Sequence, residues 1–156
     1  MRRLLWLVVA FGFGFSPLAE NGEDAKRFVG TWRLVSVESA PPDPMRGDHP
    51  IGLIHYDAAG NMAVQIMPDR DRPKWKQGES PTPEQAKEAI AGYTAYFGTY
   101  TVDEKARTVS HHRKGTINAG GVGVELVRRY EFAPGDRLIL TPVDNPSTHL
   151  TWERAR

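Results

Sequence analysis

The stretch Tyr93–Gly115, YTAYFGTYTVDEKARTVSHHRKG, decides the fold. Much of it alternates between apolar and polar residues, which is the period-two pattern of a β-strand. The polar segment Asp103–Arg107 interrupts this pattern and is short enough for a turn. The stretch therefore predicts two antiparallel strands, Tyr93–Val102 and Thr108–Ile117, joined as a hairpin.

The same pattern continues on both sides of this hairpin. Six further strands are predicted at Phe28–Glu38, Ile51–Asp57, Asn61–Met67, Val122–Phe132, Arg137–Val143 and Thr148–Arg154. Most of the connections are short and carry glycine or proline, which favours consecutive hairpins. A meander of eight strands removes its two edges most simply by closing on itself. We therefore predict an all-β fold, an eight-stranded antiparallel up-and-down barrel.

One short helix is expected between the third and fourth strands. Thr82 is a good N-cap, Pro83 suits the first helical position, and Gln85 completes a capping box. The predicted helix runs from about Glu84 to Ala91 and ends near Gly92. The long polar loop before it carries a tryptophan and several cations, and we favour a solvated loop over a lid on the barrel.

Composition excludes several classes of function. The 156 residues suggest a single domain, and the absence of cysteine excludes disulfides, thiolate metal sites and cysteine nucleophiles. A formal net charge of +1 gives no basic bias toward nucleic acid. The chain contains no Gly-x-Ser-x-Gly, phosphate-binding or His-Glu-x-x-His motif. We expect no cofactor and no metal.

The first residues have the layout of a secretory signal peptide. Two arginines precede the apolar run Leu4–Phe15, which is shorter than the ~20 residues that span a bilayer, and small residues follow it. We predict a signal peptide at 1–19, a polar linker at 20–27 and the barrel domain at 28–156. The expected location is periplasmic or secreted, with membrane attachment only if the signal is not cleaved.

Gly30-Thr-Trp32 resembles the Gly-x-Trp signature of lipocalins, and Arg154 stands where lipocalins place an arginine over that tryptophan. The chain as a whole resembles a bacterial lipocalin-like domain family. The segments that carry this resemblance are FVGTWRLVSVE, GLIHYDAAGNMAVQIM, the hairpin Tyr93–Gly115 and the last strand pair. This resemblance implies a calycin-type barrel with a small-molecule cavity. It also implies structural roles for Gly30, Trp32 and Arg154, with Trp32 closing one end of the barrel.

Two adjacent histidines, His111 and His112, invite a metal or acid–base interpretation. Neighbours on a strand point to opposite faces, however, so the two side chains cannot share one metal in a regular strand. Val109 marks the inward face, and we expect His111 inside the barrel and His112 outside. His111 is then either a hydrogen-bonded core side chain or a ligand contact. The other histidines follow no zinc spacing.

The strand Val122–Phe132 places an arginine on its apolar face. Arg128 alternates in register with Leu126 and Tyr130, so we expect it to point into the barrel. A buried guanidinium is costly unless it is paired. Its partner is either a ligand carboxylate in a bidentate fork or an interior acid such as Glu38; alternatively, Arg128 lies at a wet barrel mouth.

Other polar side chains are expected near the same cavity. Glu38 shares a face with Trp32 if the first strand is regular, and Tyr96 shares a face with Tyr100. The predicted ligand-binding residues are Arg128, His111, Tyr130, Tyr96, Tyr100 and Glu38.

Three functions remain open at this level. The leading one is an exported protein that binds a small hydrophobic molecule, whose carboxylate or other acceptor group an interior arginine anchors. The second is a cofactor-independent isomerase, cyclase or dehydratase that uses His111 as its acid–base group. The third is an envelope interaction module whose barrel is filled by its own side chains. A cavity lined by Arg128 and His111 separates the first two from the third.

Overall fold

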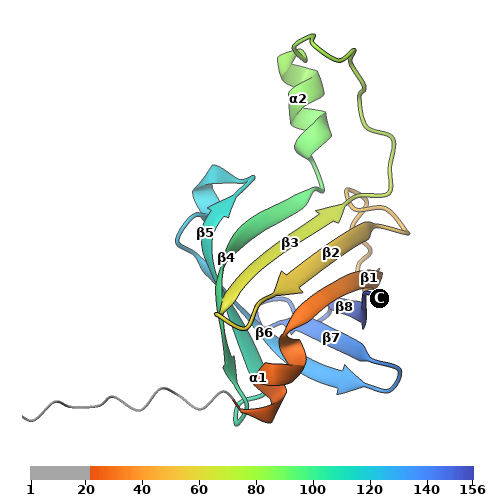
Figure 1. Ribbon diagram of the computed structural model, residues 1–156. Coiled ribbons are helices and arrows are strands. Elements are labelled where there is room, and N and C mark those ends of the chain that lie inside the picture. The colour runs from red at the N-terminus through yellow and green to blue at the C-terminus, as the bar shows by residue number, and fades with distance from the viewer. Residues whose placement is uncertain (1–21) are drawn as a thin grey trace, which may run out of the picture.

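The strands of the barrel follow one another in chain order and close on themselves (Figure 1). The computed structural model describes residues 22–156. Its strands are β1 (Gly30–Glu38), β2 (Ile51–Tyr56), β3 (Asn61–Met67), β4 (Thr94–Asp103), β5 (Thr108–Thr116), β6 (Glu125–Ala133), β7 (Arg137–Pro142) and β8 (His149–Arg154). Its helices are α1 (Glu23–Phe28), α2 (Pro83–Ile90) and the 3₁₀-helix η1 (Ala119–Gly121). The predicted eight-stranded antiparallel barrel is confirmed.

Strands β1 and β8 close the barrel, and their pairing is irregular at one point. Leu34 lies opposite Trp152, but the register then shifts between Leu34 and Ser36. Such a bulge reverses which side chains face inward beyond it. Val37 therefore lines the interior, whereas Glu38 is exposed. The prediction that Glu38 faces inward is wrong because it assumed a regular strand.

The end of the barrel beside α1 is sealed by aromatic side chains. Phe28, the last residue of α1, is fully buried and packs edge-on against the rings of Tyr56 and Tyr130. The ring centroids lie 5.2 Å apart for Tyr56 and 5.0 Å apart for Tyr130. Trp32 is 1% exposed and donates its indole N–H to the carbonyl of Phe28 at 2.8 Å. Helix α1 thus acts as a plug, although residues 23–27 were predicted to be a polar linker and Phe28 was predicted to begin the first strand, which starts at Gly30.

The three predicted structural residues meet at this sealed end. The guanidinium of Arg154 lies over the Trp32 ring, 4.2 Å from its centroid. It also donates to the carbonyls of Val29 at 2.9 Å and Arg27 at 2.7 Å. Gly30 has a φ of 135°, and a Cβ there would lie 2.5 Å from the Arg154 Nη1 atom. Only glycine fits beneath that guanidinium without a shift.

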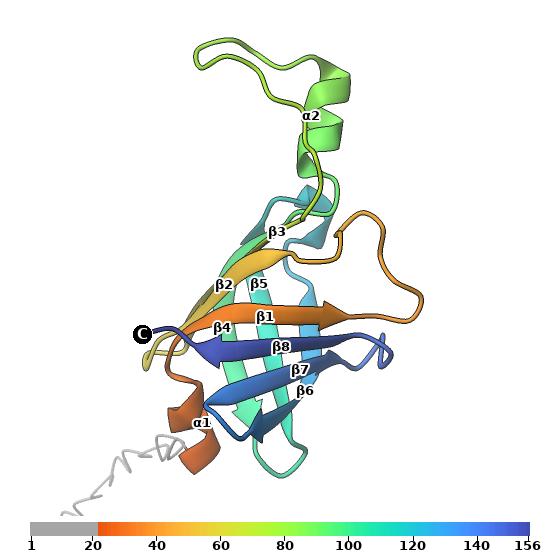
Figure 2. The ribbon, with the colours of Figure 1, turned by 90° about the vertical axis from the view of Figure 1, so that its right-hand side faces the viewer.

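Helix α2 projects away from the barrel (Figures 1 and 2). The predicted capping box is present, since Thr82 and Gln85 exchange side chain-to-backbone hydrogen bonds. Arg70 and Arg72 in the preceding loop donate to carbonyls at the last turn of α2. Trp75 is 42% exposed and is not among the residues that line the barrel cavity. The expectation of a solvated loop rather than a lid is confirmed.

Two other boundaries differ from the predicted ones. Strand β6 begins at Glu125 rather than Val122, because η1 and a turn with Gly123 at a φ of 78° precede it. The predicted signal peptide at 1–19 and the first two residues of the linker lie outside the described residues. Within residues 22–156, no helix has the length and apolar character needed to span a bilayer.

Candidate functional site

A cavity of about 430 Å³ occupies the barrel on the side away from α1. Its lining includes Ser39, Asp43 and Arg46 of the β1–β2 loop and Asn145 and Thr148 of the β7–β8 loop. Figure 2 shows both loops at the end of the barrel away from α1. A barrel filled by its own side chains would have no such space. The cavity therefore argues against the packed-barrel alternative.

The strands give the cavity a mostly apolar inner wall, and polar side chains, many of them from the loops, line the rest. The inner wall is formed by inward-facing residues of all eight strands, namely Val37, Ile54, Val64, Ile66, Leu126, Leu140 and Leu150 with Tyr96, His111 and Trp152. The period-two alternation along the strands puts these side chains inside and turns their immediate neighbours outward. An apolar wall with a few polar groups is the usual composition of a small-molecule pocket.

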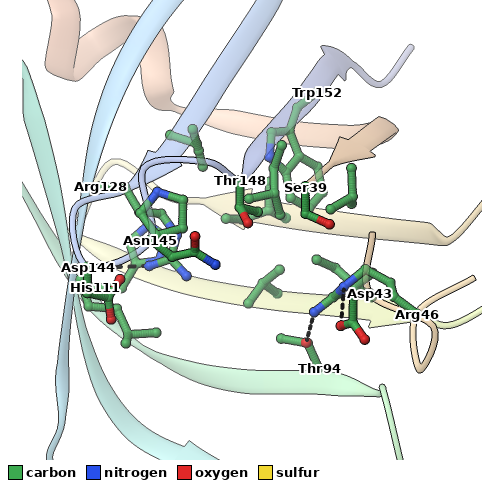
Figure 3. Close-up of a pocket in the computed structure, with 18 of the residues that line it drawn as sticks. Ser39, Asp43, Arg46, Thr94, His111, Arg128, Asp144, Asn145, Thr148 and Trp152 are labelled. Carbon is green, nitrogen blue, oxygen red and sulfur yellow. Dashed lines mark hydrogen bonds and ion pairs between the residues drawn. The ribbon is translucent and has the colours of Figure 1, made fainter. Parts of the chain in front are cut away.

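Arg128 of β6 lines this cavity, as the sequence predicted. Its side chain is half-buried, and its one hydrogen bond within residues 22–156 is a long one of 3.4 Å from Nη1 to the carbonyl of Leu126. Asp144 lines the same cavity but forms no ion pair with it. Figure 3 shows Arg128 beside Asn145 and His111, across the cavity from Arg46. The guanidinium thus keeps free donors inside the cavity.

His111 of β5 is fully buried and lies between two tyrosine side chains. Its Nε2 atom lies 2.8 Å from the hydroxyl of Tyr56, and its Nδ1 atom lies 2.9 Å from the hydroxyl of Tyr96. His112 points to the other face and pairs with the Thr101 hydroxyl at 3.1 Å. The alternation predicted for the two histidines is therefore confirmed.

The imidazole of His111 is neutral near pH 7. Burial, reinforced by the positive charge of Arg128 and by His112, holds the pKa of His111 well below its ordinary value. Both ring nitrogens already have hydrogen-bond partners, so His111 has no free nitrogen to offer a bound molecule. The acid–base role considered for His111 would have to pass through Tyr96, which lines the cavity.

Two further nitrogen donors belong to residues that line the cavity. Within residues 22–156, Trp152 Nε1 and Arg46 Nη1 are buried and have no hydrogen-bond partner. Arg46 is held at the mouth by Asp43, 3.9 Å away, and by the Thr94 hydroxyl at 3.4 Å (Figure 3). The cavity therefore carries an excess of donors over partners.

Two other predicted site residues lie at the sealed end, outside the cavity. The Tyr100 hydroxyl donates to the carbonyl of Asp57 at 2.9 Å. Tyr130 donates to the Asp24 carboxylate of α1 at 2.8 Å and packs on Phe28. Both rings point inward as predicted, but they form the plug rather than the cavity wall. Neither tyrosine lines the cavity that holds Arg128 and His111, and neither does the exposed Glu38.

Some cavity residues were not predicted. Trp152 alternates with Leu150 and Arg154 along β8, so the same period-two argument could have placed it inside. Arg46 and Asn145 lie in loops, where no periodicity signals their direction. Their contribution depends on how the loops fold over the barrel mouth.

A closed eight-stranded barrel with one sealed end, an arginine over a tryptophan at that end and an open apolar cavity is the architecture of a small-molecule-binding β-barrel. The family comparison agrees with this class. The model of the lipocalin-like domain family matches residues 29–155, and the chain belongs to that family. Membership indicates ligand binding in general.

Two other comparisons add little about function. No curated protein matches the chain. Among solved structures, a redesigned β-barrel aligns with 84% of this chain and 94% of its own, at 11% identity and a TM-score of 0.44.

Proposed function

We propose that this chain is an exported protein that binds a small, largely apolar molecule in its barrel cavity, where Arg128 holds an acceptor group such as a carboxylate. The observation that carries this proposal is the guanidinium of Arg128, half-buried in the cavity with no carboxylate partner within residues 22–156. A charge in such a place is costly until a partner arrives. A bound anion supplies that partner.

The size and lining of the cavity support a small ligand. Its volume of about 430 Å³ lies in the lower part of the range of ~300–1,000 Å³ that is usual for ligand pockets. Burial of apolar ligand surface against Ile54, Val64 and Leu140 supplies affinity at ~25 cal/mol per Å². The polar groups then fix which way round the molecule sits.

Native mass spectrometry of the full chain, produced in a bacterial host and purified without detergent, tests the binding proposal. We expect an additional mass that disappears on denaturation, and we expect it to be depleted in the variant Arg128→Met. The matched control is Arg129→Met, because Arg129 is the next residue of β6 and is exposed on the outer face. A bare polypeptide mass for the wild-type chain, or equal retention by Arg128→Met, contradicts the proposal.

Export has its own test. The proposal predicts that the protein recovered from the periplasm or medium has an intact mass that lacks residues 1–19. Retention of the full-length chain in the cytosol contradicts export and leaves the binding proposal standing. Recovery of the full-length chain in the membrane fraction indicates that the N-terminal segment stays attached as an anchor.

A further inference from the structure

The two tyrosines that flank His111 differ in what surrounds them. Tyr56 is fully buried, does not line the cavity, and its hydroxyl has no hydrogen-bond partner but His111 Nε2 within residues 22–156. Tyr96 lines the cavity, and its hydroxyl pairs with His111 Nδ1. The Tyr56–His111–Tyr96 chain of hydrogen bonds thus runs from the packed interior to the cavity.

A neutral imidazole has one N–H donor and one bare nitrogen acceptor. Because burial and Arg128 keep His111 neutral, one tyrosine must donate to the ring and the other must accept from it. The chain of hydrogen bonds therefore has a direction, and only two arrangements are possible. They differ in which tyrosine keeps a spare hydroxyl proton.

In the first arrangement, Tyr96 donates to Nδ1, and Nε2–H donates to the oxygen of Tyr56. The hydroxyl proton of Tyr56 then has no acceptor at a position fully closed to solvent. A buried donor without a partner costs ~1–3 kcal/mol. In the second arrangement, Tyr56 donates to Nε2, Nδ1–H donates to the oxygen of Tyr96, and the spare proton belongs to the hydroxyl of Tyr96. The second arrangement avoids the cost because a cavity can hold water or a ligand.

We infer that His111 is held as the Nδ1–H tautomer and that the hydroxyl of Tyr96 is thereby fixed as a hydrogen-bond donor into the cavity, where it recognises an oxyanion together with Arg128. This inference rests on the proposed function and names the ligand chemistry of the same site. Tyr56 and His111 are positioning residues, since both act through Tyr96. A carboxylate meets donors from both side chains, whereas an alcohol of the same length offers a weaker, uncharged acceptor.

Nitrogen-15 NMR of the ligand-free wild-type protein tests the direction of the hydrogen bonds. A protonated ring nitrogen and a bare one have well-separated shifts, so the assigned ring of His111 reports its tautomer directly. We expect Nδ1 to be protonated and Nε2 to be bare. Protonation at Nε2, or of both nitrogens near neutral pH, overturns the inference whatever ligand the protein binds.

Calorimetric titration with octanoate and 1-octanol tests the ligand class. The variant Tyr96→Phe should bind octanoate about tenfold more weakly than wild type, which corresponds to ~1.4 kcal/mol. Its loss for 1-octanol should be clearly smaller. The matched control is Tyr100→Phe, because the hydroxyl of Tyr100 donates to Asp57 at the sealed end rather than into the cavity. The control should bind both probes like the wild type.

The outcomes separate this inference from the proposed function. Equal losses for the two probes in Tyr96→Phe, or no loss at all, overturn oxyanion recognition by Tyr96 while the cavity remains a binding site. If neither probe binds the wild type, recognition of a small apolar anion fails together with the ligand class. The tautomer result then still decides the direction of the hydrogen bonds on its own.

Discussion

The guanidinium of Arg154 lies 4.2 Å from the centroid of the Trp32 ring, so residues from the last and first strands fasten the barrel together at its sealed end. The same side chain caps the carbonyls of Arg27 and Val29, where α1 enters the first strand. One residue thus ties the plug, the tryptophan and the strand closure into one unit.

Loss of this contact should destabilise the barrel. The variant Arg154→Met removes a cation–π pair and two hydrogen bonds to carbonyls, and we expect it to lower the free energy of unfolding by about 2 kcal/mol. Urea unfolding measures this change. Arg156→Met is the control, because Arg156 is exposed and should change stability little. Equal stability of the two variants would show that the contact contributes nothing.

His111 should also make the protein less stable as the pH falls. The folded-state pKa of His111 lies well below its ordinary value of 6.5, chiefly because of burial. Below pH 6.5, His111 is largely protonated in the unfolded chain but remains neutral in the folded chain. The free energy of unfolding therefore falls as the pH drops. One such group contributes a slope of up to ~1.4 kcal/mol per pH unit.

Urea unfolding between pH 7 and pH 5 measures this slope in the wild type and in His111→Asn. The variant should be less stable at pH 7, and its pH dependence should be flatter by the contribution of this one group. An identical slope in the variant and the wild type contradicts a neutral buried imidazole in the folded protein.

Tyr130 should support α1 and leave the cavity unaffected. The variant Tyr130→Phe loses the hydrogen bond to Asp24, and we expect a loss of about 1–2 kcal/mol. Hydrogen exchange of the amides in α1 should become faster, while octanoate binding stays unchanged. If Tyr130→Phe instead binds octanoate more weakly and the exchange rates of the α1 amides do not change, Tyr130 belongs to the ligand site, as the sequence suggested.

Asp144 should oppose the binding of an anion. It lines the cavity with Arg128 without pairing with it, and its carboxylate repels a ligand carboxylate at the mouth. The variant Asp144→Asn should bind octanoate about two- to threefold more tightly at low salt, with the gain shrinking as salt screens the charge. Calorimetry at two ionic strengths measures the effect. Weaker binding would mean that Asp144 helps to hold the ligand.

The sequence predicted much of the fold because period-two alternation reports which side chains face inward. It placed His111 and Arg128 inside the barrel, and both line the cavity. Alternation does not report height along the barrel axis, however, so Tyr130 and Tyr100 were assigned to the cavity although they lie in the plug.

Other differences have local causes. The bulge between Leu34 and Ser36 turned Glu38 outward, and no residue in that strand signals it. Helix α1 has six residues, and its stability comes from burying Phe28 in the barrel rather than from its own helix propensity. Both the bulge and the docking of α1 depend on tertiary packing, which cannot be read from a single sequence.

The most direct test of the account is a crystal structure of the full-length chain, or of its exported form, soaked with octanoate. We predict electron density for the probe inside the barrel, with its carboxylate within hydrogen-bond distance of Arg128 and the Tyr96 hydroxyl. The hydrocarbon chain should lie against Ile54, Val64 and Leu140. An empty cavity at saturating octanoate, or a probe whose carboxylate points away from Arg128, would contradict the central claim.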